Sequence, residues 1–378
     1  MTDIPVSGHV LAWARNFRGL SPEEAAERLG ISTAELEELE TEVRRPTLTK
    51  FEKIAATYQL PLATLFRRTP PPEPDELPDF RTFEGAPPQI SFEFRVALSN
   101  VRSLQAKLRV LRSEDDGYHV AALRQYDLRG DPYAQGGFER ERIGISVQRQ
   151  LDWSADDGFR HWRAVIERLG IAVYLQKFDV TDCRGCSLWD EGVTPAIIIN
   201  KAERSENAWV FTLIHEYAHL LVRRPGISDL NRRNPVEAFC NRFAAAFLMP
   251  MEALRRLLPE WPTRPIEWPD ATIREVARQL KVSAQALAIR LEELGRAEVG
   301  LHRRFAIARH PRQPTSGGDY VRTRLSELGG HFTGSIMSAL DREIIDSVHA
   351  SEALGLNPPR LDDARAYVTR QRELALAE

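Results

Sequence analysis

The stretch Phe211-Thr-Leu-Ile-His215-Glu216-Tyr-Ala-His219-Leu-Leu-Val222 decides how the rest of the chain is interpreted. Its apolar residues predict a buried helix, and residues four apart on a helix project from the same face. His215 and His219 can therefore present two imidazole nitrogens to one zinc ion. Glu216 lies next to that face, where its carboxylate can reach a water molecule on the metal. The pattern H-E-x-x-H thus predicts Zn²⁺, a bound water of lowered pKa, and a general base.

A catalytic zinc site normally takes three protein ligands, so a third ligand is expected elsewhere in the chain. The segment PVEAFCNRFAAAFLMP, residues 235–250, predicts a helix whose apolar stripe packs on the first one. Glu237 and Asn241 lie four residues apart on one face of this helix. If that face meets the histidines, Glu237 is the third metal ligand. Asn241 is then placed to hydrogen-bond the ligands from a second shell around the metal.

Two other interpretations of these residues stay open. The histidines can be satisfied within a protein core that binds no metal, which would make the motif a remnant of a site. Glu237 can equally be a surface or helix-capping carboxylate. Chance alone explains the motif poorly, because a random chain of this length contains H-E-x-x-H with a probability of about 1–2%.

The composition is that of a soluble globular protein of two to three domains. The chain has 378 residues, of which 43% are hydrophobic and 28% charged, and its net charge is −3. It contains no apolar run long enough to span a membrane, and its start lacks the pattern of a signal peptide. Three cysteines cannot build a disulfide framework. We therefore expect a cytoplasmic protein with no membrane partner.

Proline punctuation and hydrophobic periodicity divide the chain into four segments. Residues 1–68 predict a small helical bundle, and the proline-rich residues 69–90 predict an extended linker. The segment 91–296 mixes predicted helices with strands at 171–178 and 196–200 and ends in a helix pair. The segment 297–378 predicts helices of unknown role. The expected fold class is multidomain and mainly α, with an α+β zincin-like core between an all-α bundle and a helical C-terminal region.

The combination of HEYAHLLV at 215–222 with E-x-x-C-N-R-F-A-A-A-F-L-M-P at 237–250 resembles the ImmA/IrrE family of metallopeptidases. The resemblance covers residues 152–280. It implies a thermolysin-like zinc site with His215, His219 and Glu237 as ligands and Glu216 as base. It also implies that the substrate is a helix-turn-helix repressor cleaved after a stress signal. Cys240 stands where the family usually has alanine, a small residue in place of another.

The N-terminal segment contains helix-capping residues that predict two short helices joined by a tight turn. Ser21 with Glu24 predicts a capping box, Gly30 predicts a C-cap, and Ser32 repeats the N-cap pattern. Over residues 14–66 the sequence resembles an XRE-type helix-turn-helix domain of the phage repressor class. That resemblance implies that the helix at 33–40 enters the major groove of DNA.

The charged residues of this segment do not favour DNA binding. The expected recognition helix is rich in glutamate, and residues 1–68 hold nine Lys+Arg against ten Asp+Glu. DNA affinity depends largely on neutralised phosphates. The cations that could still contact a DNA backbone are Arg15, Arg18, Arg44, Arg45, Lys50 and Lys53. One alternative is a retained fold that docks a protein partner or forms a homodimer. Another is an intramolecular role, such as covering the cleft of the peptidase domain.

Two functions of different classes follow from these motifs. The first is a zinc endopeptidase that cleaves a repressor or antitoxin protein in a stress-response or phage and mobile-element context. The second is a DNA-binding transcriptional regulator or antitoxin whose peptidase fold is a sensor or partner-binding module. The intact H-E-x-x-H with a candidate third carboxylate favours the enzyme, and the acidic recognition helix weighs against the DNA binder.

Overall fold

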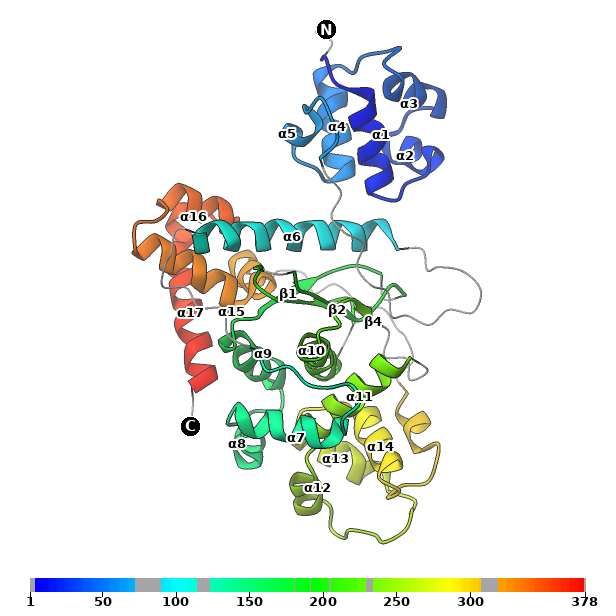
Figure 1. Cartoon of the computed structure of the whole chain (residues 1–378), viewed down its shortest axis with the longest axis vertical. Helices are drawn as coiled ribbons and strands as arrows, with labels where there is room; N and C mark the ends of the chain where they lie inside the picture. The colour runs from blue at the N-terminus through cyan, green and yellow to red at the C-terminus, as the bar shows by residue number, and fades with distance from the viewer. Residues whose placement is uncertain are drawn as a thin grey trace. The chain divides into compact units, whose positions relative to one another are not determined.

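The computed structural model describes residues 4–71, 90–113, 123–179, 181–190, 192–203, 205–228, 234–306 and 319–376. They form two compact units, shown in Figure 1. The first contains residues 1–76 and 88–100, and the second contains residues 77–87 and 101–378. Most of the predicted linker at 69–90 lies outside the described residues. The boundaries of the four predicted segments stay predictions.

The first unit is a bundle of short helices, as predicted. They are α1 Gly8–Phe17, α2 Pro22–Leu29, α3 Thr33–Glu40, α4 Leu48–Tyr58 and α5 Leu62–Leu65. The predicted capping box is confirmed, because the Ser21 hydroxyl accepts the Glu24 amide at 3.2 Å and the Glu24 carboxylate accepts the Ser21 amide at 2.8 Å. Gly30 ends α2 with a φ of 63°, in the left-handed region that favours glycine. The turn between α2 and α3 is therefore encoded locally.

The core of the first unit also takes in the start of α6, Phe92–Ser113. Phe92 and Val96 are buried among the apolar side chains of the bundle. The Arg28 guanidinium lies 4.5 Å from the centre of the Phe92 ring, close enough for a cation–π contact. Thus the first turns of α6 stabilise the helix-turn-helix bundle.

The second unit is built around one small mixed sheet. Its strands are β1 Ala172–Gln176, β2 Gly185–Leu188, β3 Ala196–Asn200 and β4 Ile227–Ser228, in the order β1-β3-β2-β4. Strands β1 and β3 are parallel, whereas β2 is antiparallel to both β3 and β4. The sequence predicted β1 and β3. It missed the two short antiparallel strands.

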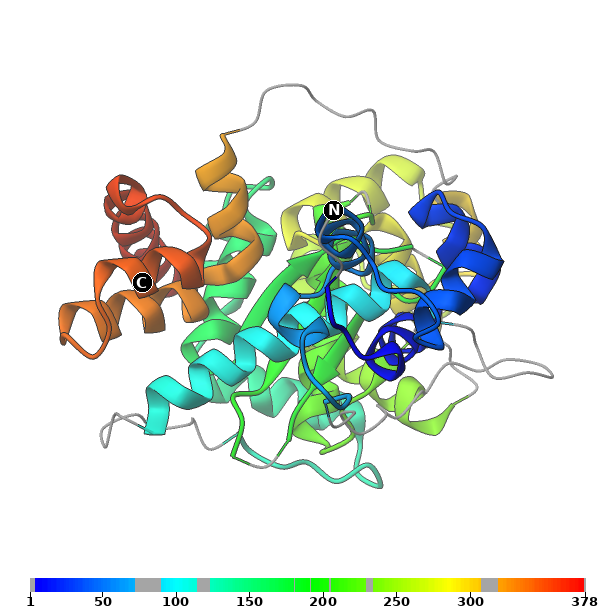
Figure 2. The ribbon, with the colours of Figure 1, turned by 90° about the horizontal axis from the view of Figure 1, so that it is seen from above.

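Helices surround this sheet on several sides. In the second unit they are α7 Pro132–Arg142, α8 Val147–Asp152, α9 Gly158–Arg168, α10 Glu206–Leu221, α11 Pro235–Leu248, α12 Met251–Leu257, α13 Asp270–Leu280, α14 Ala284–Glu293, α15 Tyr320–Asp341, α16 Ser347–Leu354 and α17 Leu361–Leu376. Figures 1 and 2 show α9 and α10 on one face of the sheet and the later part of α6 on the other. The predicted class, mainly α with an α+β core, is confirmed. Among the described residues, no helix is long and apolar enough to cross a membrane.

Helix α15 packs along β1, the edge strand of the sheet. The helix kinks at Gly329, whose φ of 82° and ψ of 169° are not helical. At this kink the buried ion pair of Arg163 and Glu167 on α9 reaches the helix backbone. Arg163 donates to the Ser326 carbonyl, and the Glu167 carboxylate accepts the Gly330 amide at 2.9 Å. The C-terminal region is thereby joined to the core by buried polar contacts.

We expect Gly329→Ala to lower the melting temperature of the protein by about 5–12 °C. A Cβ at this position would lie 2.2 Å from Glu167 Oε1 and 2.6 Å from the Val173 carbonyl oxygen. The alanine backbone would also have to keep a φ of 82°, in the left-handed region that disfavours residues with a Cβ. Strain and overpacking of this kind cost about 2–4 kcal/mol together. Gly334→Ala in the same helix is the matched control, because its Cβ would meet only Val368, at 3.5 Å. An equal loss of thermal stability in both variants would contradict the prediction.

Candidate metal centre

Helix α10 places two histidines side by side in the core. Its apolar sequence buries it under the sheet, and the imidazoles of His215 and His219 are both fully buried. Their Nε2 atoms lie 3.1 Å apart, and their ring centres are 4.8 Å apart. The helical spacing of four residues therefore brings the two nitrogens to one point, as the sequence predicts.

Helix α11 brings a carboxylate to the same point. It starts at Pro235, where the Asn234 side chain caps it by accepting the Val236 amide at 2.9 Å. Glu237 lies in the first turn and is fully buried. Its two carboxylate oxygens lie 3.1 Å from His215 Nε2 and 3.2 Å from His219 Nε2. The three side chains form the one group of possible metal ligands found among the described residues.

The electrostatics of this cluster fit a bound cation. Burial raises the pKa of Glu237, but the hydrogen bonds that its carboxylate accepts from His215 and His219 outweigh burial and lower the pKa to about 2. The carboxylate is therefore ionised. Burial lowers the pKa of His219, yet Cys240 and Glu237 raise it well above its ordinary value. A metal would take the place of that proton, so its binding should release protons.

His219 is also held in the orientation that metal ligation requires. Its Nδ1 lies 2.9 Å from the Arg224 carbonyl oxygen, which can only accept a hydrogen bond. This contact assigns the proton to Nδ1 and turns Nε2 towards His215 and Glu237. When a metal replaces the proton on Nε2, two imidazole nitrogens and one carboxylate can all act as ligands, and this donor set suits Zn²⁺.

Glu216 lies beside the cluster but is not part of it. It follows His215 on α10, and its side chain is almost fully buried. Strand β2 crosses close to it at Gly185, where a Cβ would lie 2.6 Å from Thr212 Cγ2 and 3.3 Å from Glu216 Cγ. Gly185 thus lets the sheet approach the motif helix closely. No local pattern in the sequence marks this glycine, because its role depends on a contact between β2 and α10.

Asn241 lies one turn after Glu237 on α11 and is nearly buried. It lines a pocket of about 280 Å³ together with Phe211, which lies one turn before His215 on α10. The pocket is also lined by Ser283, the N-cap residue of α14, and by Ile289 within that helix. The pocket therefore lies about one helical turn from the candidate ligands. The role of Asn241 in a second shell of hydrogen bonds stays a prediction.

The cations proposed for DNA contacts differ sharply in accessibility. Arg15 is paired with Glu40 at 2.8 Å and is mostly buried. Arg18 is 1% exposed, and its guanidinium donates to the carbonyls of Tyr58 and Gln59 at 2.7 and 2.8 Å. Arg18 thus holds the bundle together, and this placement does not fit the predicted contact with a DNA phosphate.

The remaining cations lie nearer the surface of the bundle. Lys50 forms an ion pair with Glu35 of α3, and Arg44 lies 3.5 Å from the same carboxylate. Arg45 is exposed and has no ion pair with any residue that the structure describes. The acidic helix α3 therefore neutralises most of the cations that would approach DNA.

Comparisons with known proteins agree with both parts of this architecture. Residues 166–292 match the IrrE N-terminal-like domain, a peptidase family, and residues 11–65 match a helix-turn-helix domain. A comparison with curated proteins finds no match. The peptidase match spans the histidine helix, α11 and the sheet, and the other match spans α1 to α5. The chain therefore combines a helix-turn-helix domain with an IrrE N-terminal-like peptidase domain.

Proposed function

We propose that the chain is a zinc-dependent endopeptidase. The observation that carries the proposal is the convergence of His215, His219 and Glu237, all buried, with the Glu216 carboxylate next to them. Zinc would be held by the first three residues and would polarise the peptide carbonyl and acidify a water molecule. The resemblance of the N-terminal domain to repressors suggests a cytoplasmic regulatory role. We propose four segments: a helix-turn-helix domain at 1–68, a linker at 69–90, a metallopeptidase domain at 91–296 and a helical C-terminal region at 297–378.

Glu216 supplies the proton transfers of this mechanism. Its carboxylate accepts a proton from the attacking water as the new carbon–oxygen bond forms. It then returns the proton to the amide nitrogen as the carbon–nitrogen bond breaks, which makes Glu216 base and then acid. The near-complete burial of Glu216 keeps competing water away from the proton. The neighbouring pocket of Phe211 and Asn241 would receive a side chain of the substrate.

The proposed substrate is a protein that controls transcription or toxicity, either a helix-turn-helix repressor or an antitoxin. The experiment is to incubate the purified, zinc-loaded chain with a proteome of the source cells and to identify new protein N-termini by mass spectrometry. The control is the same chain after removal of zinc by a chelator. We expect cleavage of one or a few helix-turn-helix proteins by the zinc-loaded chain alone. Identical sets of N-termini with and without zinc would contradict the proposal.

DNA binding is the second candidate function, favoured by the helix-turn-helix match and by the exposed Arg45. In this alternative the peptidase fold serves as a sensor or partner-binding module. The ion pairs of Glu35 with Lys50 and Arg44 work against it, since they neutralise cations on the surface that would face phosphates. A homodimer of the first unit would double the number of phosphate contacts.

We expect Glu35→Gln to strengthen DNA binding and to make its salt dependence steeper. The substitution frees Lys50 and Arg44, and each new phosphate contact adds about 0.9 to the slope of log K against log salt. The slope should therefore rise by about 1–2, as measured by fluorescence anisotropy with duplex DNA. Glu37→Gln is the matched control, because Glu37 is exposed on the same helix and has no ion pair among the described residues. If both variants have the wild-type slope, Glu35 does not limit DNA binding.

A further inference from the structure

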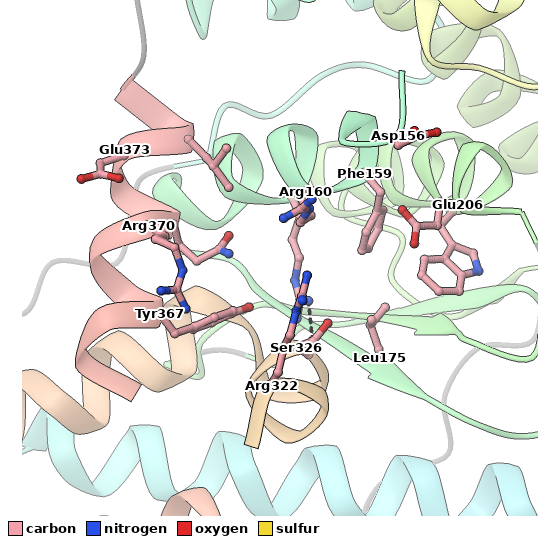
Figure 3. A pocket seen from close by; sticks show the side chains of 14 residues that line it. Asp156, Phe159, Arg160, Leu175, Glu206, Arg322, Ser326, Tyr367, Arg370 and Glu373 are labelled. Atoms are coloured by element: carbon pink, nitrogen blue, oxygen red, sulfur yellow. Dashed lines mark hydrogen bonds between the residues drawn. The ribbon is translucent and has the colours of Figure 1, made fainter. Parts of the chain in front are cut away.

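A pocket of about 840 Å³ lies between the peptidase core and the C-terminal helices, away from the candidate metal centre. Helix α9, strand β1 and the start of α10 form one side of it, and α15 and α17 form the other (Figure 3). Its volume is within the roughly 300–1,000 Å³ of small-molecule sites. No residue of the H-E-x-x-H motif lines it, so the metal centre does not explain it.

One wall of this pocket is aromatic. The rings of Phe159 and Trp209 meet edge to face, with centres 5.3 Å apart and planes at 75°. Both side chains are mostly buried, and the Trp209 indole donates to the Glu203 carbonyl at 2.9 Å. Tyr367 of α17 lines the opposite side. The wall is therefore rigid and presents an apolar surface to a flat ring.

The opposite side of the pocket carries arginines without carboxylate partners. Arg322 of α15 and Arg370 of α17 line the pocket with exposed side chains. Neither forms an ion pair with a carboxylate among the described residues. By contrast, the Arg163 guanidinium donates hydrogen bonds to the carbonyls of Val173 and Ser326 and to the Glu167 carboxylate. Arg160 forms an ion pair with Asp157. Two guanidinium groups thus remain for an anion.

Two carboxylates of the pocket lie apart from this pair of arginines. Figure 3 shows Asp156 and Glu206 beside Phe159, across the pocket from Arg370, while Glu373 points away from Arg370. The two arginines that lack an ion pair therefore lie on the side of the C-terminal helices, and Asp156 and Glu206 lie beside the aromatic wall. A ligand that matches the pocket carries its anionic group at one end and hydrogen-bond donors on a ring at the other.

We propose that this pocket binds a small organic anion with an amino-substituted aromatic ring. Arg322 and Arg370 hold the phosphate or carboxylate group, Phe159 and Trp209 contact the ring, and Glu206 accepts hydrogen bonds from its amino group. The C-terminal helices then have a role, since they supply the anion-binding side of the site. The ligand also contacts the first turns of α10, the helix that carries His215 and His219.

Calorimetric titration of the full-length chain tests this proposal without any measurement of peptidase activity. The probes are adenosine 5′-monophosphate, which carries a phosphate, and 4-aminobenzoate, which carries a carboxylate. Adenosine and inorganic phosphate are the controls that lack the anion and the ring, respectively. We expect saturable binding of one probe per chain, and the better probe identifies the anionic group. Absence of binding by both probes, or equal binding of inorganic phosphate alone, would overturn the proposal.

Variants assign the binding to this pocket. Arg322→Gln and Arg370→Gln should each weaken the binding of the better probe by about 10- to 100-fold, since a charge-assisted hydrogen bond contributes about 1.5–3 kcal/mol. Arg372→Gln is the matched control, because Arg372 is exposed on the same helix and does not line this pocket. Thermal unfolding of each variant should match the wild type in the absence of ligand. Equal binding by the wild type and both pocket variants would place the ligand elsewhere and refute the assignment.

Discussion

Glu237→Gln is expected to weaken zinc binding about a thousandfold and to leave the purified chain without zinc. Structural zinc sites bind with about 10–16 kcal/mol, so one of three ligands in a site of similar affinity contributes about 3–5 kcal/mol. Glutamine keeps the size of the side chain but replaces the ionised carboxylate that lies 3.1 and 3.2 Å from the two histidine nitrogens. The measurement is elemental analysis of the chain after dialysis, together with competition against a chelator of known affinity.

His219→Ala should lose zinc in the same way, because its Nε2 belongs to the same cluster. Glu260→Gln is the control for the glutamate substitution, since Glu260 is exposed and far along the chain from the motif. The wild type and Glu260→Gln should each hold one zinc per chain. A folded wild type that holds no metal would leave the three residues as a buried polar cluster, which is the alternative that the sequence left open.

Helix caps and runs of β-branched residues in the sequence predicted the bounds of helix α3 and strand β3. Helix α3 begins and ends at the predicted residues, 33 and 40, because the Ser32 hydroxyl caps it by accepting the Glu35 amide at 3.1 Å. Strand β3 occupies the predicted residues 196–200, because its β-branched run is buried on both faces. Periodicity and caps are properties of neighbouring residues, and the sequence displays them directly.

Strands β2 and β4 escaped prediction because their stability comes from pairing. Strand β2 has the sequence GCSL, with a glycine and a serine that do not favour strands, and β4 has two residues. Their register depends on β3, to which β2 pairs from Gly185 to Leu188. The same strand carries Cys186. Cys183 and Cys186 are both buried, and neither is part of a disulfide.

Charged side chains were the least predictable part of the molecule. Glu139 lies in the charge-rich stretch FERER and would be taken for a surface residue, yet it is fully buried. It accepts hydrogen bonds from Tyr126 and from Tyr217 of the motif helix, and it is paired with Arg142. Arg18 is a second case, held by backbone carbonyls. The burial of Glu139 and Arg18 depends on hydrogen-bond partners distant in sequence, so it can be recognised only from the folded structure.

Glu216→Gln is expected to lower the rate of peptide cleavage by about 100- to 10,000-fold while zinc binding stays at the wild-type level. The amide cannot accept the proton of the attacking water or return it to the leaving nitrogen. Zinc remains because Glu216 is not among the three side chains whose donor atoms converge. The rate is measured on a peptide that contains a cleavage site found in the proteome experiment, with metal content determined on the same sample.

The separation of the two readouts distinguishes a base from a ligand or a structural residue. Glu237→Gln loses metal and cleavage together, whereas Glu216→Gln should lose cleavage alone, with kcat reduced and KM little changed. Glu216 lies where β2 approaches α10 at Gly185, and glutamine preserves the shape of the side chain that fits there. Thermal unfolding of the variant should therefore match the wild type. Cleavage at the wild-type rate by a zinc-loaded Glu216→Gln chain would show that another group moves the proton, and the mechanism would have to be reassigned.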